Sequence, residues 1–281
     1  MKNRKASVPR KGVARSDAKK IKAEIRQDYA RIITEKSSCC GPGQSPRGFA
    51  SQAGYREGEL KSVPEEAAAS SFGCGNPLAL AELKSGEVVL DLGSGAGLDV
   101  LLASQQVGPS GKVYGLDMTP EMIAQARKNL AQAGIRNVEI LEGDIEAIPL
   151  PDASVDFVTS NCVINLAPDK EKVFREIFRV LRPAGRFSVS DIVTKNLSPA
   201  VRAKLPASGC VALALEEEDY LEAIRQAGFS QVAVTKRVPF DLSAGGQLLS
   251  GDCGCGCGGH GSVGSSAGQI ISLTVQGRKT E

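Results

Sequence analysis

The spacing of apolar residues predicts a helix near the N-terminus. Between Ser16 and about Lys36, apolar positions recur three, four and eight residues apart, so they share one face of a helix. These positions are Ile21, Ile25, Tyr29, Ile32 and Ile33. Ser16 is suited to cap this helix, and its apolar face has to pack against the rest of the protein. The residues from there to Val63 are dense in Gly, Pro and Ser, which predicts a mobile loop.

From Gly86 onward, short apolar runs alternate with amphipathic segments. The predicted strands are residues 87–92, 112–117, 138–144, 154–161, 186–193, 231–240 and 269–277. The predicted helices include residues 119–134, 169–181 and 220–228, the first capped by Thr119 and closed by Gly134. This βαβ alternation predicts an α/β fold with a doubly wound, mostly parallel sheet. The last two strands are expected to form a hairpin interrupted by a Gly/Cys-rich insertion, residues 243–268.

The chain length suits one large α/β domain with additions, because a domain typically takes about 100 to 200 residues. We place that domain at residues 62–281, after the N-terminal helix and a Cys-bearing loop at residues 16–61. Residues 1–15 carry six Lys or Arg and little that packs, which predicts a disordered basic arm. The hydrophobic content of 42%, the charged content of 23% and the net charge of +2 do not favour a nucleic-acid partner.

The sequence has no run of 18 apolar residues and no apolar signal-peptide core behind its basic N-terminus. We therefore expect a cytoplasmic protein that does not bind a membrane. We also expect it to be a monomer. Because the cytosol keeps thiols reduced, the eight cysteines are expected to be ligands or nucleophiles and not a disulfide framework. The chain has a single histidine, His260, which leaves little room for histidine-based acid–base catalysis.

A glycine-rich turn, DLGSGAG at residues 91–97, follows the first predicted strand. Its glycines let the backbone pass close to a ligand. Asp117 ends the second strand, where a carboxylate can hold both hydroxyls of a ribose. Asp144 and Ile145 follow the third strand and are placed to bracket an adenine ring. Because ligands of open α/β sheets bind at the carboxyl ends of the strands, these residues predict one nucleoside site.

Four segments resemble the class I S-adenosylmethionine-dependent methyltransferases: LDLGSGAG, GLDMTPEMI, GDIEAIPLPDASVDFV and VFREIFRVLRPAGRFSVSDI. The resemblance covers about Ser62 to Gly277. It implies a Rossmann-like, seven-stranded sheet in the order 3-2-1-4-5-7-6, with S-adenosyl-L-methionine as the cofactor. The expected cofactor-binding residues are Asp91, Gly93, Ser94, Gly95, Gly97, Asp117, Met118, Asp144, Ile145 and Asn161.

Three further stretches resemble the arsenite methyltransferases: YREGELKSVPEEAAASSFGCGNP, TSNCVINLAPDK and ASGCVALALEEEDYLEAIRQAGF. In that family one cysteine of each stretch serves the metalloid, which implies Cys74, Cys162 and Cys210 as catalytic arsenic ligands, with Cys39 or Cys40 as a fourth catalytic cysteine. Trivalent arsenic is soft and takes three sulfur ligands in a pyramid, which leaves its lone pair exposed. That lone pair would displace the methyl group from the sulfonium without a general base, as part of arsenic detoxification.

Methyl transfer raises arsenic formally to the pentavalent state, so two electrons must return it to the trivalent state. A dithiol that becomes a disulfide supplies two electrons. Cys39 or Cys40 with Cys74 is the candidate pair, because neighbouring cysteines bridge one another only with strain. We hypothesise that Cys40 is the partner of Cys74. A thiol reductant of the glutathione or thioredoxin type is then expected to restore the dithiol.

The stretch GDCGCGCGGHG places Cys253, Cys255 and Cys257 at alternate positions, which share one face of an extended chain. The glycines between them allow all three thiols to reach one ion, whether arsenite, zinc or copper(I). A metalloid-collecting role, adventitious metal binding and a flexible loop without a ligand are all compatible with this pattern.

Two other functions fit parts of the sequence. One is a carbon or oxygen methyltransferase that acts on a lipid, sterol or quinone, but such an enzyme does not need three spaced thiols. The other is a non-catalytic metalloid-binding protein, but such a protein does not need the cofactor turn.

Overall fold

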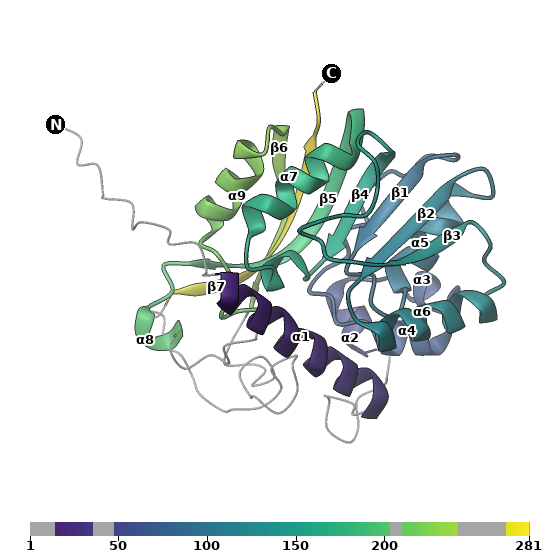
Figure 1. Cartoon of the computed structure of the whole chain (residues 1–281), viewed down its shortest axis with the longest axis horizontal. Coiled ribbons are helices and arrows are strands. Elements are labelled where there is room, and N and C mark those ends of the chain that lie inside the picture. The colour runs from purple at the N-terminus through teal and green to yellow at the C-terminus, as the bar shows by residue number, and fades with distance from the viewer. Residues whose placement is uncertain (1–14, 36–47, 203–209, 241–267, 281) are drawn as a thin grey trace.

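The computed structural model describes residues 15–35, 48–202, 210–240 and 268–280. Its centre is a seven-stranded sheet in the order β3-β2-β1-β4-β5-β7-β6 (Figure 1). The strands are β1 (Val88–Leu92), β2 (Lys112–Asp117), β3 (Val138–Glu142), β4 (Val155–Asn161), β5 (Leu181–Lys195), β6 (Ser230–Phe240) and β7 (Gln269–Arg278). Strands β1 to β5 pair in parallel, whereas β7 runs antiparallel to both β5 and β6. The predicted sheet order and the final antiparallel pair are confirmed.

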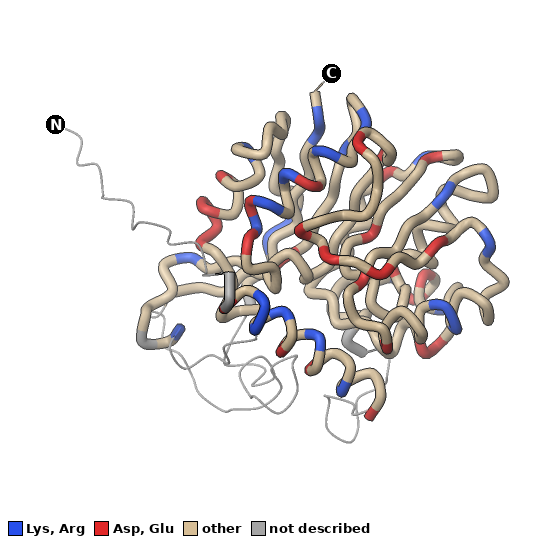
Figure 2. Tube along the Cα trace, in the orientation of Figure 1, with Lys and Arg blue, Asp and Glu red and all other residues tan. Residues whose placement is uncertain are grey.

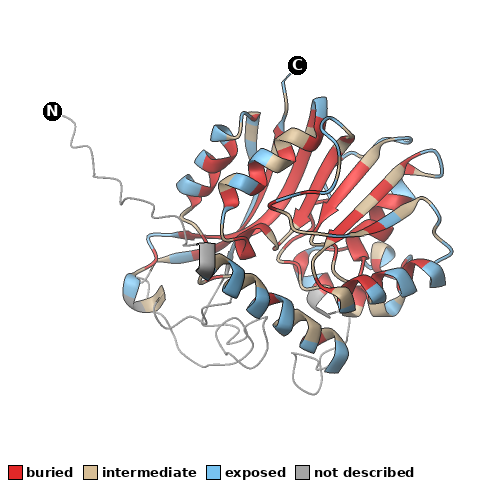
Figure 3. Cartoon of the chain, in the orientation of Figure 1, coloured by how far each residue is buried: buried red, intermediate tan, exposed pale blue. Residues whose placement is uncertain are grey.

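Helices cover both faces of this sheet. On one face lie α5 (Leu98–Val107) and α6 (Pro120–Gln132), and on the other α7 (Lys170–Val180) and α9 (Glu217–Gln226). Buried residues therefore fill the strands and the inner sides of the helices (Figure 3). Because parallel strands are covered on both faces, their apolar side chains form the core, and ligands are left to the strand ends.

Two predicted helix boundaries agree with the structure. Thr119 precedes α6, and Gly134 follows it with a φ of +68°. Asp169 precedes α7, and its carboxylate accepts a hydrogen bond from the backbone N–H of Lys172 at 2.9 Å. Such a capping bond satisfies one of the donors that a helix leaves free at its first turn.

The predicted N-terminal helix is α1 (Arg15–Glu35), which lies beside α6 across the carboxyl ends of the strands (Figure 1). Its apolar face points inward, as expected, with Ile25 and Ile32 buried. Ser16 does not cap this helix, because the helix already includes Arg15.

The residues after position 47 correct the prediction of a mobile loop that extends to Val63. They form α2 (Gly48–Ala53) and α3 (Glu57–Lys61), followed by α4 (Glu65–Ala69). Ala50, Tyr55 and Leu60 are buried in the core on the α5 side. Tertiary packing thus outweighs a local composition that favours loops, a competition that sequence patterns do not reveal.

Two short elements, η1 (Ile164–Leu166) and α8 (Pro199–Arg202), complete the described fold. Lys and Arg are interspersed with Asp and Glu over the chain (Figure 2), which is consistent with the small net charge. None of the helices among the described residues is long and apolar enough to span a bilayer. The expected basic arm, the loop with Cys39 and Cys40, and the Gly/Cys-rich insertion lie outside the described residues, apart from single terminal positions.

Candidate active site

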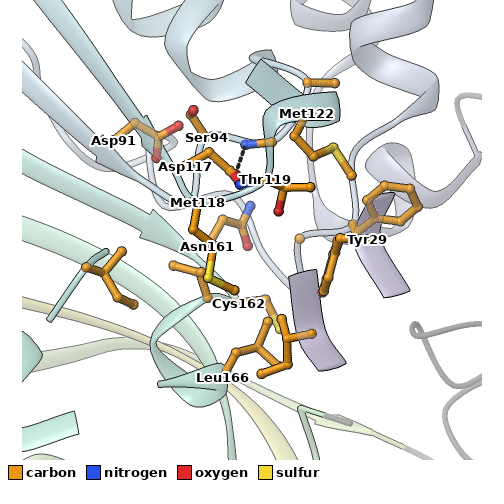
Figure 4. A pocket seen from close by; sticks show the side chains of 18 of the residues that line it. Tyr29, Asp91, Ser94, Asp117, Met118, Thr119, Met122, Asn161, Cys162 and Leu166 are labelled. Carbon is orange, nitrogen blue, oxygen red and sulfur yellow. Dashed lines mark hydrogen bonds between the residues drawn. The ribbon is translucent and has the colours of Figure 1, made fainter. Parts of the chain in front are cut away.

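The glycine-rich turn after β1 lines a pocket at the carboxyl ends of β1, β2 and β4 (Figure 4). The backbone N–H groups of Gly93 and Ser94 donate to the carbonyl of Leu116 in β2, at 2.7 and 3.0 Å. Gly93 and Gly95 adopt positive φ angles of +69° and +50°, which glycine tolerates best. A Cβ built on Gly95 meets no atom within 4 Å, so the backbone here faces open space in the pocket.

Asp117, at the end of β2, lies against this turn. Its Oδ2 accepts a hydrogen bond from the backbone N–H of Gly95 at 2.9 Å, and its Oδ1 accepts one from that of Thr119 at 2.8 Å. Burial raises the pKa of Asp117, although these two hydrogen bonds favour its charged form. Met118 lines the same pocket. The structure thus places Asp117 and Met118 beside the glycine turn.

Two buried carboxylates, Asp91 and Asp99, stand in the wall of this pocket. Burial raises the pKa of Asp99 to about 6, although a 2.6 Å hydrogen bond from the Tyr55 hydroxyl favours the charged form. Burial also raises the pKa of Asp91 well above its usual range, and the charges of Asp99 and Asp117 raise it further. A cation beside these carboxylates would relieve their repulsion and lower both pKa values.

Helix α1 closes the other side of the pocket with Lys22, Ile25 and Tyr29. The Lys22 ammonium forms ion pairs with Asp144 at 2.6 Å and with Glu146 at 2.8 Å. Tyr29 also meets the ring of Phe72 edge to face, with the ring centroids 6.2 Å apart. In Figure 4, Tyr29 lies across the pocket from Asp91 and Asp117.

The contribution of α1 was only partly predictable. The apolar spacing that includes Ile25 and Tyr29 predicted that one face of the helix packs against the rest of the protein. Lys22 was missed, because a lysine beside an apolar stripe usually faces solvent. Asp144 and Ile145 were expected at an adenine ring, and both line the pocket, with Asp144 also engaged by Lys22.

Three free thiols come together beside this pocket, on the side of β5 and β7. Cys162 directly follows β4 and is buried, and its thiol hydrogen-bonds with those of Cys74 and Cys210. Apolar residues surround them: Ile192, Leu197, Val201, Val211, Ala214 and Ile270. The structure thus brings together the three cysteines that the resemblance singled out from separate parts of the chain.

Within the described residues, no group of three or more His, Cys, Asp and Glu side chains is arranged to hold a metal ion. Cys74, Cys162 and Cys210 are therefore neighbours that still have to converge before all three bind one atom. Cys39, Cys40, Cys253, Cys255, Cys257 and His260 lie outside the described residues.

Each of the three thiols has a raised pKa. For Cys74, the hydrogen bond with Cys162 lowers the pKa, but burial and the charge of Asp191 outweigh it. For Cys162, the hydrogen bond with Cys210 lowers the pKa, whereas that with Cys74, together with burial, raises it well above the usual range. For Cys210, the hydrogen bond with Cys162 and burial both raise the pKa. All three are therefore protonated thiols at neutral pH.

Asp191 of β5 is a buried acid whose charge acts on these thiols, and sequence reasoning missed it. Its carboxylate accepts a hydrogen bond from the Tyr220 hydroxyl at 2.8 Å. Burial raises the pKa of Asp191 to about 7, although Tyr220 and the positive charge of Lys170 favour the ionised form. No local motif marks this residue, because its environment is made by α7 and α9 folding over β5.

Asn161, the last residue of β4, stands between the pocket and the thiols. It lines the pocket, as expected for a cofactor-binding residue. Its amide, however, hydrogen-bonds to the backbone of Gly75, next to Cys74. It also donates to the Tyr55 hydroxyl at 2.9 Å. The structure therefore gives Asn161 contacts that the sequence did not indicate.

Residues 83–228 match a protein family described as a methyltransferase domain. An arsenite methyltransferase of Halobacterium salinarum is 41% identical over 240 residues, which cover 80% of this chain and 61% of that protein. An arsenite methyltransferase of Aquipseudomonas alcaligenes is 35% identical over 233 residues, which cover 78% of this chain and 65% of that protein. This chain thus spans less than two thirds of the length of either relative.

A solved structure gives the same indication. An arsenic(III) S-adenosylmethionine methyltransferase from Chlamydomonas reinhardtii matches with a TM-score of 0.65 and 32% identity, over 79% of this chain and 73% of that one. The chain therefore belongs to the methyltransferase-domain family, and within it to the arsenite S-adenosylmethionine methyltransferases.

Proposed function

We propose that this protein transfers a methyl group from S-adenosylmethionine to trivalent arsenic held by Cys74, Cys162 and Cys210. The observation that carries the proposal is the meeting of three free thiols beside a pocket built on a glycine turn. A methyltransferase that acts on carbon or oxygen has no use for such a group of thiols. A metalloid trap, in turn, has no use for the turn and the carboxylates.

Features of the pocket itself support S-adenosylmethionine as the cofactor. The Ser94 hydroxyl is buried without a hydrogen-bond partner among the described residues, and Gly95 faces open space. Asp91 and Asp99 would hold the ammonium of the methionine part, because a cation beside them would offset the burial and the negative charges that raise their pKa values. Asp117 would accept hydrogen bonds from the ribose hydroxyls, and Asp144 and Ile145 would bracket the adenine ring. When bound, S-adenosylmethionine supplies an electrophilic methyl group on a sulfonium.

The protonation state of the thiols suits the binding of arsenite. Arsenous acid has three hydroxyl groups, and each leaves as water when a thiol delivers its proton and forms an arsenic–sulfur bond. Three thiols therefore give one arsenic trithiolate and three waters, with no proton left over and no general base required. Raised pKa values keep Cys74, Cys162 and Cys210 protonated, so each thiol carries the proton that leaves with a hydroxyl group as water.

The same arrangement serves the methyl transfer. Arsenic bound by three thiolates keeps its lone pair, which forms the new arsenic–carbon bond as the sulfonium–carbon bond breaks. The apolar residues around the thiols would exclude water, and the closeness of the pocket and the thiols, with Cys162 in the pocket lining, would bring the reacting atoms together. Arsenic becomes formally pentavalent, and a dithiol oxidised to a disulfide returns two electrons. Cys74 with Cys40 or Cys39 remains the hypothesis for that dithiol.

The proposed reaction also needs a reductant and a reducing compartment. A thiol reductant of the glutathione or thioredoxin type would restore the dithiol after each turnover. The need for free thiols favours a reducing compartment such as the cytoplasm.

The experiment is to incubate the purified chain with S-adenosylmethionine, arsenite and a small thiol, and to separate the arsenic species by mass. Single variants Cys74→Ser, Cys162→Ser and Cys210→Ser are compared with a triple serine variant of Cys253, Cys255 and Cys257. We expect methylated arsenic from the wild type, and a loss of about 100-fold or more in each single variant, since each removes an arsenic ligand. A wild type that binds S-adenosylmethionine but leaves arsenite unmethylated would contradict the proposal.

A further inference from the structure

The backbone N–H and carbonyl of Gly75, the residue after Cys74, both hydrogen-bond to the side chain of Asn161. The backbone N–H of Gly75 donates to Oδ1 of Asn161 at 3.2 Å, and Nδ2 of Asn161 donates to the carbonyl of Gly75 at 2.7 Å. On the other side of Cys74, a Cβ built on Gly73 would lie 2.2 Å from Nδ2 of Asn161. The backbone of Gly73 therefore rests directly on the amide. Asn161 thus holds Gly75 by two hydrogen bonds and lies against Gly73.

Cys162 is fixed by the same short piece of chain. It directly follows Asn161 and has a φ of +64°, so the backbone turns sharply at the end of β4. Its backbone N–H donates to the carbonyl of Ser190 in β5 at 2.7 Å, which anchors that turn to the sheet. Two adjacent residues thus set the positions of two thiols: Cys162 carries one of them, and Asn161 holds the segment that carries the other.

The hydrogen-bonding capacity of the Asn161 amide is used within the protein. Its Nδ2 donates to the carbonyl of Gly75 and to the Tyr55 hydroxyl, with a longer contact of 3.4 Å to Oδ2 of Asp99, while its Oδ1 accepts from Gly75. Tyr55 in turn donates to Asp99 at 2.6 Å. Donors that are already engaged are poorly placed to recognise a cofactor, although the side chain lies in the pocket wall.

We infer that Asn161 is a positioning residue that keeps the Cys74 segment beside Cys162, so that both thiols can close on one arsenic atom. The inference rests on the proposed function, and it assigns Asn161 to the thiols and not to the cofactor. It also names the substrate class concerned, trivalent arsenicals that exchange three ligands. An arsenical with only two exchangeable ligands needs two thiols, and Cys162 and Cys210 already hydrogen-bond to each other.

The test compares Asn161→Ser with the wild type in full-length protein. Two arsenicals are titrated: arsenite, which takes three thiols, and phenylarsine oxide, which takes two and releases one water. We expect Asn161→Ser to weaken arsenite binding by about 10- to 100-fold, because two hydrogen bonds to the Cys74 segment are lost. Phenylarsine oxide binding should stay at the wild-type level. Because Asn161 also contacts Asp99 in the pocket wall, the affinity for S-adenosylhomocysteine should change by less than the affinity for arsenite.

Two further variants sharpen the test. Ser272 of β7 donates from its hydroxyl to the carbonyl of Cys74 at 2.7 Å, so Ser272→Ala removes a different hydrogen bond to the same segment. It should show the same selective loss to a smaller extent. Asn137→Ser is the matched control, because the Asn137 amide also donates to a backbone carbonyl, that of Gly108, but away from the thiols. It should bind both arsenicals as the wild type does.

The outcomes separate the inference from the proposed function. Equal arsenite affinity in Asn161→Ser and the wild type would overturn the inference. A parallel loss of arsenite and phenylarsine oxide binding would also overturn it, since that is the result of a general structural defect. A loss of S-adenosylhomocysteine affinity alone would overturn the inference and assign Asn161 to cofactor binding. A wild type that binds no arsenite, or a Cys74→Ser variant that binds it normally, would instead defeat the proposed function.

Discussion

Lys22 of α1 forms an ion pair with Asp144 of the loop after β3, with 2.6 Å between Nζ and Oδ2. These residues are far apart in the sequence, and the pair ties the N-terminal helix to the expected adenine end of the pocket. The ammonium also reaches Glu146 at 2.8 Å, so one lysine bridges two carboxylates. Helix α1 therefore closes the pocket through a charged contact as well as through its apolar face.

We predict that Lys22→Met weakens S-adenosylmethionine binding about fivefold to tenfold, because a partly buried, charge-assisted contact of the closing helix is lost. Calorimetric titration at low and high salt measures the effect, and the difference between wild type and variant should shrink at high salt. Lys20→Met is the matched control, since Lys20 is exposed and only approaches Glu24 of the same helix at 3.8 Å. Equal affinities for Lys22→Met and the wild type would show that α1 closes the pocket without this ion pair.

Gly93 and Gly95 should respond differently to alanine, although both have positive φ angles. A Cβ on Gly93 would lie 2.5 Å from a side-chain carbon of Val163, so Gly93→Ala should lower the free energy of unfolding by about 1 to 3 kcal/mol. A Cβ on Gly95 enters open pocket space, so Gly95→Ala should lower stability only by about 1 kcal/mol. It should nevertheless weaken cofactor binding tenfold or more, by the order expected for a misplaced ligand.

Chemical denaturation and cofactor titration of both glycine variants provide the measurement. A Gly95→Ala protein that binds S-adenosylmethionine as tightly as the wild type would place the cofactor elsewhere. The opposite ranking of the two stability changes would contradict the packing described around the turn.

Asp191 should make the stability of the fold depend on pH. Its pKa of about 7 in the folded state exceeds the unfolded value near 4, so the folded protein holds its proton more tightly. The resulting stability is fully present below about pH 4 and is lost as the pH rises through 7. Asp191→Asn stays neutral, so relative to the wild type its free energy of unfolding should improve between pH 4 and 8, on the order of 3 kcal/mol.

Urea denaturation of wild type and Asp191→Asn at several pH values measures this difference. Tyr220→Phe serves as the comparison, because it removes the hydroxyl that stabilises the charged carboxylate but leaves the acid in place. It should keep the pH dependence and move it to higher pH. A wild-type stability that rises from pH 5 to 8 in parallel with that of Asp191→Asn would exclude the raised pKa.

The three thiols should react slowly with alkylating reagents at neutral pH. Their pKa values are all raised, and the thiolate is the nucleophile. We expect iodoacetamide to label Cys74, Cys162 and Cys210 more slowly at pH 7.5 than it labels the same cysteines in the unfolded chain. Peptide mapping by mass spectrometry gives the rates site by site. Labelling of Cys162 as fast as in the unfolded chain would contradict the description of its surroundings.

The sequence was informative where a pattern has one structural solution. Alternating apolar runs and helices predict a doubly wound, mostly parallel sheet, because parallel strands need helical crossovers, whereas the strand order was predicted only through the resemblance. Cys74, Cys162 and Cys210 were singled out only through resemblance, since nothing in their spacing indicates that they meet. The helices at residues 48–61 were missed because the burial of Ala50 and Leu60 depends on the folded core.

Contacts between distant segments were beyond sequence reasoning. The bonds of Asn161 to Gly75 and of Lys22 to Asp144 join side chains to partners that only the folded chain brings near. The raised pKa of Asp191 has the same origin, because burial in the folded protein causes it and outweighs the hydrogen bond from Tyr220. Such features are set by tertiary packing, which leaves no periodic signal.

Because the three thiols come from separate segments, arsenic bound as proposed would link those segments to one another. Arsenic bound to Cys74, Cys162 and Cys210 would act as a three-way staple between the loop before β1, the end of β4 and the connection after β5. Trivalent arsenic forms only three bonds, so each methyl group it gains removes one arm of that staple. In the proposed reaction, the number of arsenic–sulfur bonds would therefore fall with each methyl group added, and this loss of bonds would favour product release.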